Sequence, residues 1–308
     1  MRWRKLGLVY RPTGELSWAR QYAHLPTPIL LEPSRIRVYF AGLDEQKFGR
    51  IGYVDVDADD PTRVLAISRE PSLDLGEPGA FDDSGVNPSC ILKIGERFRL
   101  YYIGWQRTER VPYQLFSGAA ESAEGERFER RSRVPVLDRT DAEPFLRSAP
   151  SVLKMKRGFR AWYVSATNWI NVQGKPYPRY VVRTTFSFDG IAWPNVGTIC
   201  IDLAGDEFGI GRPWVIRDAD RFRMWYSIRS HSRPYRIGYA ESPDGINWIR
   251  MDDGVGIAAS ASGWDSEMIC YAAVIDVNGR RLMFYNGNRH GEGESVWPGC
   301  YWHVADQQ

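Results

Sequence analysis

Short apolar runs recur along the whole chain and are separated by Gly, Pro, Asp and Asn. Runs of this length between turn residues are typical of β-strands, and no long segment has the 3.6-residue period of an amphipathic helix. The pattern of hydrophobic and polar positions therefore predicts an all-β protein.

The runs belong to a repeat of roughly 60 residues, which occurs five times. Each copy has a first run after Pro or Ala, a second run that ends in an aromatic residue, a third run, a polar turn and a fourth short strand. The segment YRIGYAESPDGINW (235–248) is the third run with its turn, where Asp-Gly allows a tight hairpin. The first runs begin at Pro28, Pro88, Pro150, Pro213 and Ala272, and the second runs end at Phe40, Tyr102, Tyr163, Tyr226 and Tyr285.

Four antiparallel strands repeated five times predict a five-bladed β-propeller. The fifth copy stops after its third strand, and residues 2–7 resemble a missing fourth strand. We expect this N-terminal strand to complete the last blade and close the ring. No linker is visible, so residues 1–308 are expected to form a single propeller domain.

Composition adds little to this picture. The net charge is +2, which gives no general attraction to nucleic acid or to a membrane surface. The cysteines at 90, 200, 270 and 300 form no CxxC pair or metal-ligand spacing, so free thiols in a reducing compartment are expected. With no signal peptide and no long apolar run, we expect a cytoplasmic protein that needs no cofactor. The oligomeric state stays open.

In a propeller, the loop entering each first strand and the loop joining strands two and three open on one face, where function is expected. Four of the five entering loops carry carboxylates, whereas the first offers His24. Converging carboxylates suit glycoside chemistry, in which one acid protonates the leaving oxygen and a second group acts opposite. Their mutual repulsion separates their pKa values and so supplies the two roles. The acidic residues are Asp82, Asp83, Glu143, Asp206, Glu207, Asp265 and Glu267.

Glu143 or Glu207 is the expected general acid, and Asp83 or Asp265 the expected base or stabiliser. Because Asp and Glu are common in turns, a structural role for any one carboxylate stays open. Arg212 is either an ion-pair partner of Glu207 or Asp206, or a substrate contact. The residues expected to bind substrate are His24, Asp82, Asn87, Trp105, Arg147, Trp169, Arg212, Arg229, His231, Glu267, Tyr271, Asn286 and Asn288.

Among these residues, Trp105 and Trp169 are expected to stack on a sugar ring, while the two histidines have packing roles as alternatives. Arginine forks match phosphate and carboxylate groups. Arg147, Arg212 and Arg229 with His231 therefore indicate an anionic sugar, such as a sugar phosphate, a nucleotide sugar or an acidic sugar.

The repeats and the acidic mouth resemble the five-bladed glycoside hydrolases of families 43, 32, 62 and 68 and the family 130 phosphorylases. The phrases FDDSGVNPS, GRPWV and GWDSEMICY look like a group of bacterial family 32/43-like proteins that often accompany surface-polysaccharide or other biosynthetic genes. The resemblance covers essentially the whole chain. It implies an Asp in each of blades one and two and a Glu in blade three.

Blade two matches this pattern with Asp83 or Asp82, and Glu143 is the candidate in blade three. Residues 21–27 of blade one contain no carboxylate, which departs from the families. Family 43-like propellers sometimes hold a channel metal, and the residues leave that alternative open. Family 130 adds phosphorolysis as an alternative to hydrolysis.

The leading hypothesis is an enzyme acting on a glycosidic or N-glycosidic bond of a small, anionic, sugar-containing molecule. The alternatives are a non-catalytic sugar-binding propeller, motivated by blade one, and a biosynthetic lyase or cyclase that reuses the acidic pocket. An arginine that plugs the mouth would favour the binding protein or a different chemistry.

Overall fold

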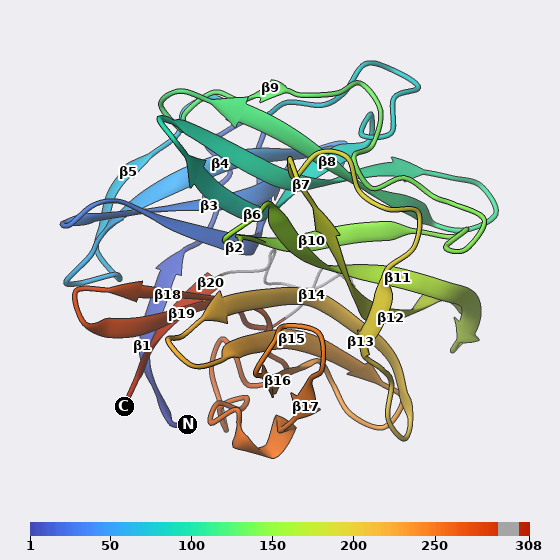
Figure 1. Cartoon of the computed structure of the whole chain (residues 1–308). Coiled ribbons are helices and arrows are strands. Elements are labelled where there is room, and N and C mark those ends of the chain that lie inside the picture. The colour runs from blue at the N-terminus through green and yellow to red at the C-terminus, as the bar shows by residue number, and fades with distance from the viewer. Residues whose placement is uncertain (289–301) are drawn as a thin grey trace.

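The computed structural model describes residues 1–288 and 302–308, and its regular structure is almost entirely β-strand (Figure 1). We divide the strands into five units of four, numbered along the chain. Units 1 and 2 are β2 (Gln21–Glu32), β3 (Arg35–Leu43), β4 (Gly49–Asp57) and β5 (Val64–Ile67), then β6 (Gly85–Ile94), β7 (Arg97–Arg107), β8 (Tyr113–Ser122) and β9 (Glu129–Arg130).

Units 3 and 4 are β10 (Arg147–Lys154), β11 (Phe159–Val172), β12 (Lys175–Ser187) and β13 (Thr198–Ile201), then β14 (Glu207–Arg217), β15 (Phe222–Ser230), β16 (Arg236–Ser242) and β17 (Ile249–Arg250). Unit 5 is β18 (Cys270–Val277), β19 (Arg280–Asn286), β20 (Trp302–Gln307) and β1 (Trp3–Tyr10). Within every unit, neighbouring strands are antiparallel. The described residues also include a short 3-10 helix at Asp252–Gly254.

Unit 5 is assembled from both ends of the chain. Strand β1 pairs with β20, with Trp3 opposite Gln307 and Lys5 opposite Ala305. The N- and C-termini consequently lie close together (Figure 1). The N-terminal strand thus takes the outer position of the last sheet, and it continues beyond the expected residues 2–7 to Tyr10.

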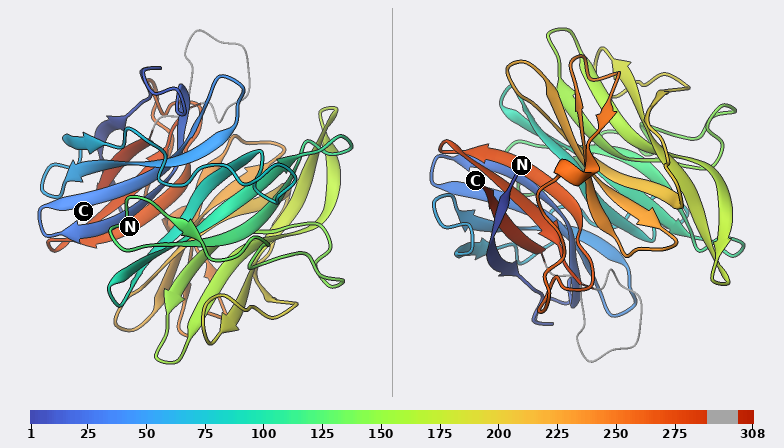
Figure 2. Two further views of the ribbon diagram at one scale, coloured as in Figure 1. Left: turned by 90° about the horizontal axis from the view of Figure 1, so that it is seen from above. Right: turned by 90° about the horizontal axis from the view of Figure 1, so that it is seen from below.

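The units pack face to face in cyclic order. Strand β2 contacts β6, β6 contacts β10, β10 contacts β14, β14 contacts β18, and β18 contacts β2 again (Figure 2). An apolar cluster lies between each pair of successive units, including the pair of units 5 and 1, whose cluster contains Phe284 and Phe40. Burial of these clusters is the main stabilising contribution to such a stack of sheets.

The recurring polar turn connects units 2, 3 and 4 to the unit that precedes each of them. An aromatic side chain in the second strand donates a hydrogen bond to a glycine carbonyl in the turn of the next unit. Each of these glycines has φ of +73°, and a Cβ there would lie within 3.0 Å of the aromatic side chain. Both the left-handed backbone and the close contact therefore require glycine. The pairs are Tyr39–Gly125 at 2.5 Å, Tyr101–Gly190 at 2.8 Å and Trp162–Gly245 at 2.8 Å.

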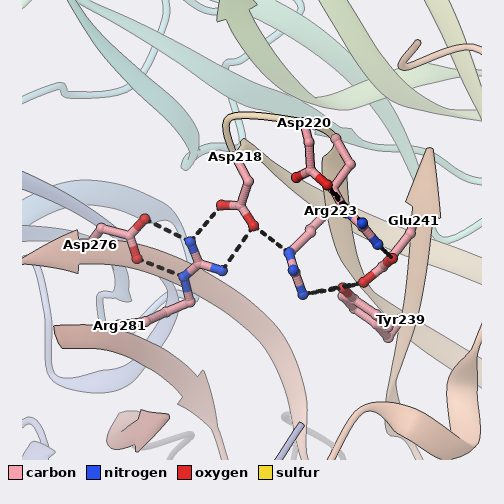
Figure 3. Close-up of polar contacts among 8 residues, drawn as sticks. Asp218, Asp220, Arg223, Tyr239, Glu241, Asp276 and Arg281 are labelled. Atoms are coloured by element: carbon pink, nitrogen blue, oxygen red, sulfur yellow. Dashed lines mark hydrogen bonds and ion pairs between the residues drawn. The ribbon is translucent and has the colours of Figure 1, made fainter. Parts of the chain in front are cut away.

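Unit 4 lacks this link because the chain termini stand where the next turn would be. The indole Nε1 of Trp225 has no hydrogen-bond partner among the described residues, and its ring packs on Trp3 with 6.2 Å between centroids. An ion pair between Asp218 and Arg281 joins units 4 and 5. Asp218 lies between Arg223 of β15 and Arg281 of β19, at 2.5 and 2.6 Å (Figure 3).

Candidate functional site

A cavity of about 410 Å³, which we call the mouth cavity, is lined by residues from all five units. Most of its surface is aromatic or aliphatic. It contains two guanidinium groups, those of Arg212 and Arg229, and no carboxylate of a described residue lines it. Its aromatic lining consists of Tyr22, His24, Trp105, Tyr113, Tyr177, Tyr180 and Tyr271.

Strained backbone gathers at the mouth cavity. A positive φ is uncommon for residues other than glycine and costs of order 1–3 kcal/mol. Three of the eight described examples, Lys47, Gln173 and Asn278, lie in hairpin turns. The other five all line the mouth cavity, with φ between 50° and 63°: Tyr22, Leu25, Ala149, Arg212 and Tyr271. The fold maintains this strain where the first strands begin, which is typical of a functional site.

Arg212 crosses the centre of the molecule from unit 4 to unit 1. Its Nη2 donates to the carbonyl of Pro26 at 3.0 Å and to Oγ1 of Thr27 at 2.8 Å. The residue is 2% exposed, and neither Nε nor Nη1 has a hydrogen-bond partner among the described residues. Burial lowers the pKa of Arg212 to about 10, so the guanidinium stays charged at neutral pH. The result is a buried cation beside a cavity without a counter-ion, which is costly unless a ligand supplies the negative charge.

Arg229 forms the wall between the mouth cavity and a second one. Its Nε donates to the hydroxyl of Tyr235, and its guanidinium lies 5.1 Å from the ring centroid of Tyr177 and 5.6 Å from that of Tyr180. The second cavity, which we call the side cavity, has a volume of about 480 Å³ and also includes His231 and Glu267. Tyr177 and Arg229 line both cavities.

His24 and Asn87 form a half-buried polar pair that also lines the mouth cavity. His24 Nε2 lies 3.4 Å from Asn87 Oδ1. Burial lowers the pKa of His24 to about 4, although the contact with Asn87 opposes this shift. The imidazole is therefore neutral at pH 7 and offers hydrogen bonding rather than charge.

Three of the expected acidic residues pair with the tyrosine that ends the second apolar run of their repeat and lies within the second strand of the unit. Each carboxylate is almost fully buried and accepts a bond from the tyrosine hydroxyl. Burial and the adjacent carboxylate raise the pKa of all three tyrosines, so the hydroxyls remain donors. The pairs are Asp82–Tyr102, Glu143–Tyr163 and Asp265–Tyr285, at 2.9, 2.8 and 3.1 Å.

Basic side chains neutralise these carboxylates. Asp82 pairs with Arg130 at 2.8 Å, and Asp265 pairs with Lys5 of the N-terminal strand. Glu143 lies 3.5 Å from Arg147. The expected anion anchor Arg147 therefore lies against a carboxylate and away from the mouth cavity, and its Nη2 donates to the Pro194 carbonyl.

Unit 4 uses a variation of this pairing. Tyr226 donates to Asp252, and Glu207 accepts bonds from Arg236 at 3.0 Å and Arg250 at 2.8 Å. Of the two roles left open for Arg212, an ion pair with Glu207 or Asp206 is therefore absent from the described contacts. In unit 1 the equivalent aromatic residue is Phe40, which has no hydroxyl, and the entering loop has no carboxylate.

The remaining expected residues are divided between the two cavities and the scaffold. Trp105 and Tyr271 line the mouth cavity. Asp83 caps its own turn, where it accepts bonds from Gly79 N and Ser84 Oγ, both at 2.9 Å. Trp169 packs on Tyr113 outside the described lining. Asn286 connects units 5 and 1 through the backbone of residues 23 and 25, and Asn288 accepts from Glu267 N.

Sequence reasoning missed four tyrosines of the mouth cavity, Tyr22, Tyr113, Tyr177 and Tyr180. The available signal is the third repeat, where the second and third strands are the longest of the fold and meet at Gln173-Gly174. This long hairpin carries Tyr177 and Tyr180. Among the described residues no group of three or more His, Cys, Asp or Glu is placed to hold a metal ion. That part of the chain also contains no helix long and apolar enough to span a membrane.

Comparisons with known proteins identify relatives and the fold. No protein-family model matches the chain. It is 39% identical over 292 residues to the uncharacterized protein Rv1502 of Mycobacterium tuberculosis strain H37Rv, covering 94% of this chain and 96% of that protein. The uncharacterized protein MT1551 of the CDC 1551 strain matches with the same identity and coverage.

Solved structures with a similar fold include several titled as glycoside hydrolases. One titled simply glycoside hydrolase has a TM-score of 0.75 and 17% identity, covering 99% of this chain and 91% of its own. A thermostable family-43 glycoside hydrolase has a TM-score of 0.70 and 14% sequence identity, covering 95% of this chain and 91% of its own. The Bombyx mori GH32 beta-fructofuranosidase has a TM-score of 0.65 and 13% sequence identity, covering 97% of this chain and 61% of its own. The expected glycoside hydrolase-like, all-β fold is confirmed, and at these identities the likeness shows the fold alone.

Proposed function

The chain belongs to the family of the Mycobacterium tuberculosis protein Rv1502, and we propose that it is a five-bladed propeller that binds a small, anionic, sugar-containing molecule in its mouth cavity. The five units are then the blades, and the pairing of β1 with β20 closes the ring. The cyclic contacts of the first strands support this architecture.

The observation that carries the proposal is the state of Arg212. Its charge is buried beside the mouth cavity, two of its nitrogens have no partner among the described residues, and none of those residues pairs with it through a carboxylate. A bound phosphate or carboxylate would compensate this charge with charge-assisted hydrogen bonds. The side chain also crosses the channel to Thr27, as expected for a binding site rather than for a mouth open to two catalytic carboxylates.

The aromatic lining supports a ring-shaped ligand. Trp105, Tyr113 and Tyr180 present flat apolar surfaces with polar atoms at their edges, which suit the faces and hydroxyl groups of a sugar. His24 and Asn87 add neutral hydrogen-bonding groups on the same cavity. A cavity of about 410 Å³ lies within the range that holds small molecules.

A thermal-shift screen tests this proposal. Sugar phosphates and sugar acids at about 100 times their Kd should raise Tm by about 5 °C, whereas neutral aryl glycosides should not. The variant Arg212→Met removes the charge at similar length and should abolish the shift. The exposed Arg131→Ala serves as the control and should keep it. Equal stabilisation by neutral glycosides, or an unchanged shift in Arg212→Met, would contradict the proposal.

Cleavage of a glycosidic bond is the second candidate, favoured by a fold shared with glycoside hydrolases over nearly the whole chain. Glu143 or Glu207 would then be the acid, and Asp83 or Asp265 the base. Of these, Glu143 has a buried Oε2 without a hydrogen-bond partner among the described residues, although the residue lies outside the lining of the mouth cavity. To act, it would have to exchange its ion pair with Arg147 for substrate.

Product analysis separates the two candidates. A ligand found in the screen is incubated with the protein and analysed by chromatography. Under the binding proposal the ligand is recovered unchanged. Turnover that is lost in Glu143→Gln and in Asp83→Asn, while both variants still bind, would establish the hydrolase. A rearranged product without added water would instead indicate the lyase or cyclase alternative.

A further inference from the structure

The mouth cavity and the side cavity have a common wall that carries a positive charge. Tyr177 and Arg229 line both cavities. Four rings surround the Arg229 guanidinium within 6 Å, those of Tyr177, Tyr180, Phe208 and Tyr235. Its Nη1 is buried and has no hydrogen-bond partner among the described residues. A charged group of a ligand that lies across this wall would therefore meet a cation held rigidly between aromatic rings.

The side cavity differs in character from the mouth cavity. Among the described residues that line it, it adds the cationic side chains of Lys175 and Arg233 to that of Arg229, with one carboxylate, that of Glu267. It also offers flat surfaces for a second ring, because Phe208 and His231 lie there with 5.0 Å between their ring centroids. Each cavity therefore offers aromatic surface for one ring group, and Arg229 lies in the wall between them.

We propose that the ligand is a nucleoside diphosphate sugar or a molecule of the same design, with one ring group in each cavity and its diphosphate at Arg229. This inference rests on the proposed function, since it specifies the anionic ligand of the mouth cavity. A ligand with only one ring and one phosphate would leave one cavity empty. Two ring groups joined by two phosphates would use both aromatic surfaces and place negative charge against Arg229, Arg233 and Lys175.

Isothermal titration with four classes of probe tests this design. The probes are nucleoside diphosphate sugars (UDP-glucose, GDP-mannose and dTDP-glucose), the matching sugar 1-phosphates, the matching nucleoside monophosphates, and inorganic pyrophosphate. At least one nucleoside diphosphate sugar should bind at least about tenfold more tightly than both of its halves, because the linked rings gain contacts in both cavities.

Variants of the three cationic residues test whether they contact the diphosphate. Arg229→Lys should weaken the nucleoside diphosphate sugar by about tenfold or more through loss of charge-assisted bonds. It should change the affinity for sugar 1-phosphate much less. Because Arg229 also packs among tyrosines, the exposed pair Arg233→Ala and Lys175→Met provides a second test at the outer side of the side cavity, with Arg131→Ala as the matched control.

The outcomes distinguish failure of the two-cavity ligand from failure of the proposed function. Sugar phosphates that bind in an Arg212-dependent manner, with no nucleoside diphosphate sugar binding more tightly, would overturn the two-cavity ligand and leave the proposed function standing. Tight binding of a nucleoside diphosphate sugar that is indifferent to Arg229→Lys, Arg233→Ala and Lys175→Met would also overturn it. Failure of every anionic probe to bind would overturn both.

Discussion

Gly245 provides a direct test of how the units are joined. Its φ is +73°, and an added Cβ would lie 2.9 Å from Cζ2 of Trp162 in the preceding unit. The left-handed conformation costs alanine about 1 kcal/mol. The overlap with a fully buried indole adds about 1–3 kcal/mol, because neither neighbour can move without disturbing the core. Gly245→Ala should therefore lose about 2–4 kcal/mol in the free energy of unfolding.

Gly279→Ala isolates the strain from the overlap. Gly279 has φ of +77° in the turn between β18 and β19, and an added Cβ would meet nothing within 4 Å. Gly279→Ala should therefore lower the free energy of unfolding only by the cost of the left-handed backbone, about 1 kcal/mol. Urea unfolding of both variants measures the difference through the midpoint at constant slope. Equal losses in the two variants would refute the claim that the recurring turn is fitted against the previous unit.

A double-mutant cycle with Trp162→Phe adds a second check on this contact. The smaller ring removes the atom that the new methyl group would meet, although it also removes the bond to the Gly245 carbonyl. The combined loss of Gly245→Ala and Trp162→Phe should therefore be smaller than the sum of the single losses. Strict additivity would show that the two residues do not interact.

Three further predictions follow from charges and hydroxyls. Asp218→Asn should lower stability by about 2 kcal/mol at pH 7, by loss of charge-assisted bonds from Arg223 and Arg281. Burial acts to raise the pKa of Asp218, but these bonds outweigh it and lower the pKa. The difference in the free energy of unfolding between wild type and Asp218→Asn, measured in urea, should therefore shrink as pH falls below 4. Phe40→Tyr should cost about 1–3 kcal/mol in thermal unfolding, because the new hydroxyl is buried without a carboxylate in its unit. Because burial lowers the pKa of His24 to about 4, NMR should show a neutral His24 ring at pH 6. The free energy of unfolding should decline as pH falls from 6.5 towards 4, and this decline should be absent in His24→Asn.

Much of the fold could be predicted because the repeat fixes the positions of strands independently of any one residue. The aromatic residue at the end of each second run and the N-terminal strand beside β20 follow from this register. The length of the β11–β12 hairpin could not be predicted, because a hairpin that extends beyond the sheet has no partner in the other repeats. That extension places Tyr177 and Tyr180 in the mouth cavity.

The lining of the mouth cavity could be predicted in part for the same reason. Residues beside the start of a first strand were expected at the mouth, and His24, Asn87, Arg212 and Tyr271 do line the mouth cavity. Position alone could not distinguish a side chain that lines the cavity from one that turns into the sheet. Carboxylates such as Glu143 turn inward, because a tyrosine hydroxyl and a basic group receive them there.

The contrast between residues that line the cavity and carboxylates that turn into the sheet indicates where functional residues lie in a repeated fold. A residue type that recurs with the repeat answers a need shared by every unit, and the carboxylates recur with the tyrosines and are absent where the aromatic residue is Phe40. A residue that serves one ligand has no reason to recur. The position before Pro28 and its equivalents differs in every unit: Thr27, Asn87, Ala149, Arg212 and Tyr271. Four of these line the mouth cavity, and the one cation among them, Arg212, is the one whose charge the described scaffold does not neutralise.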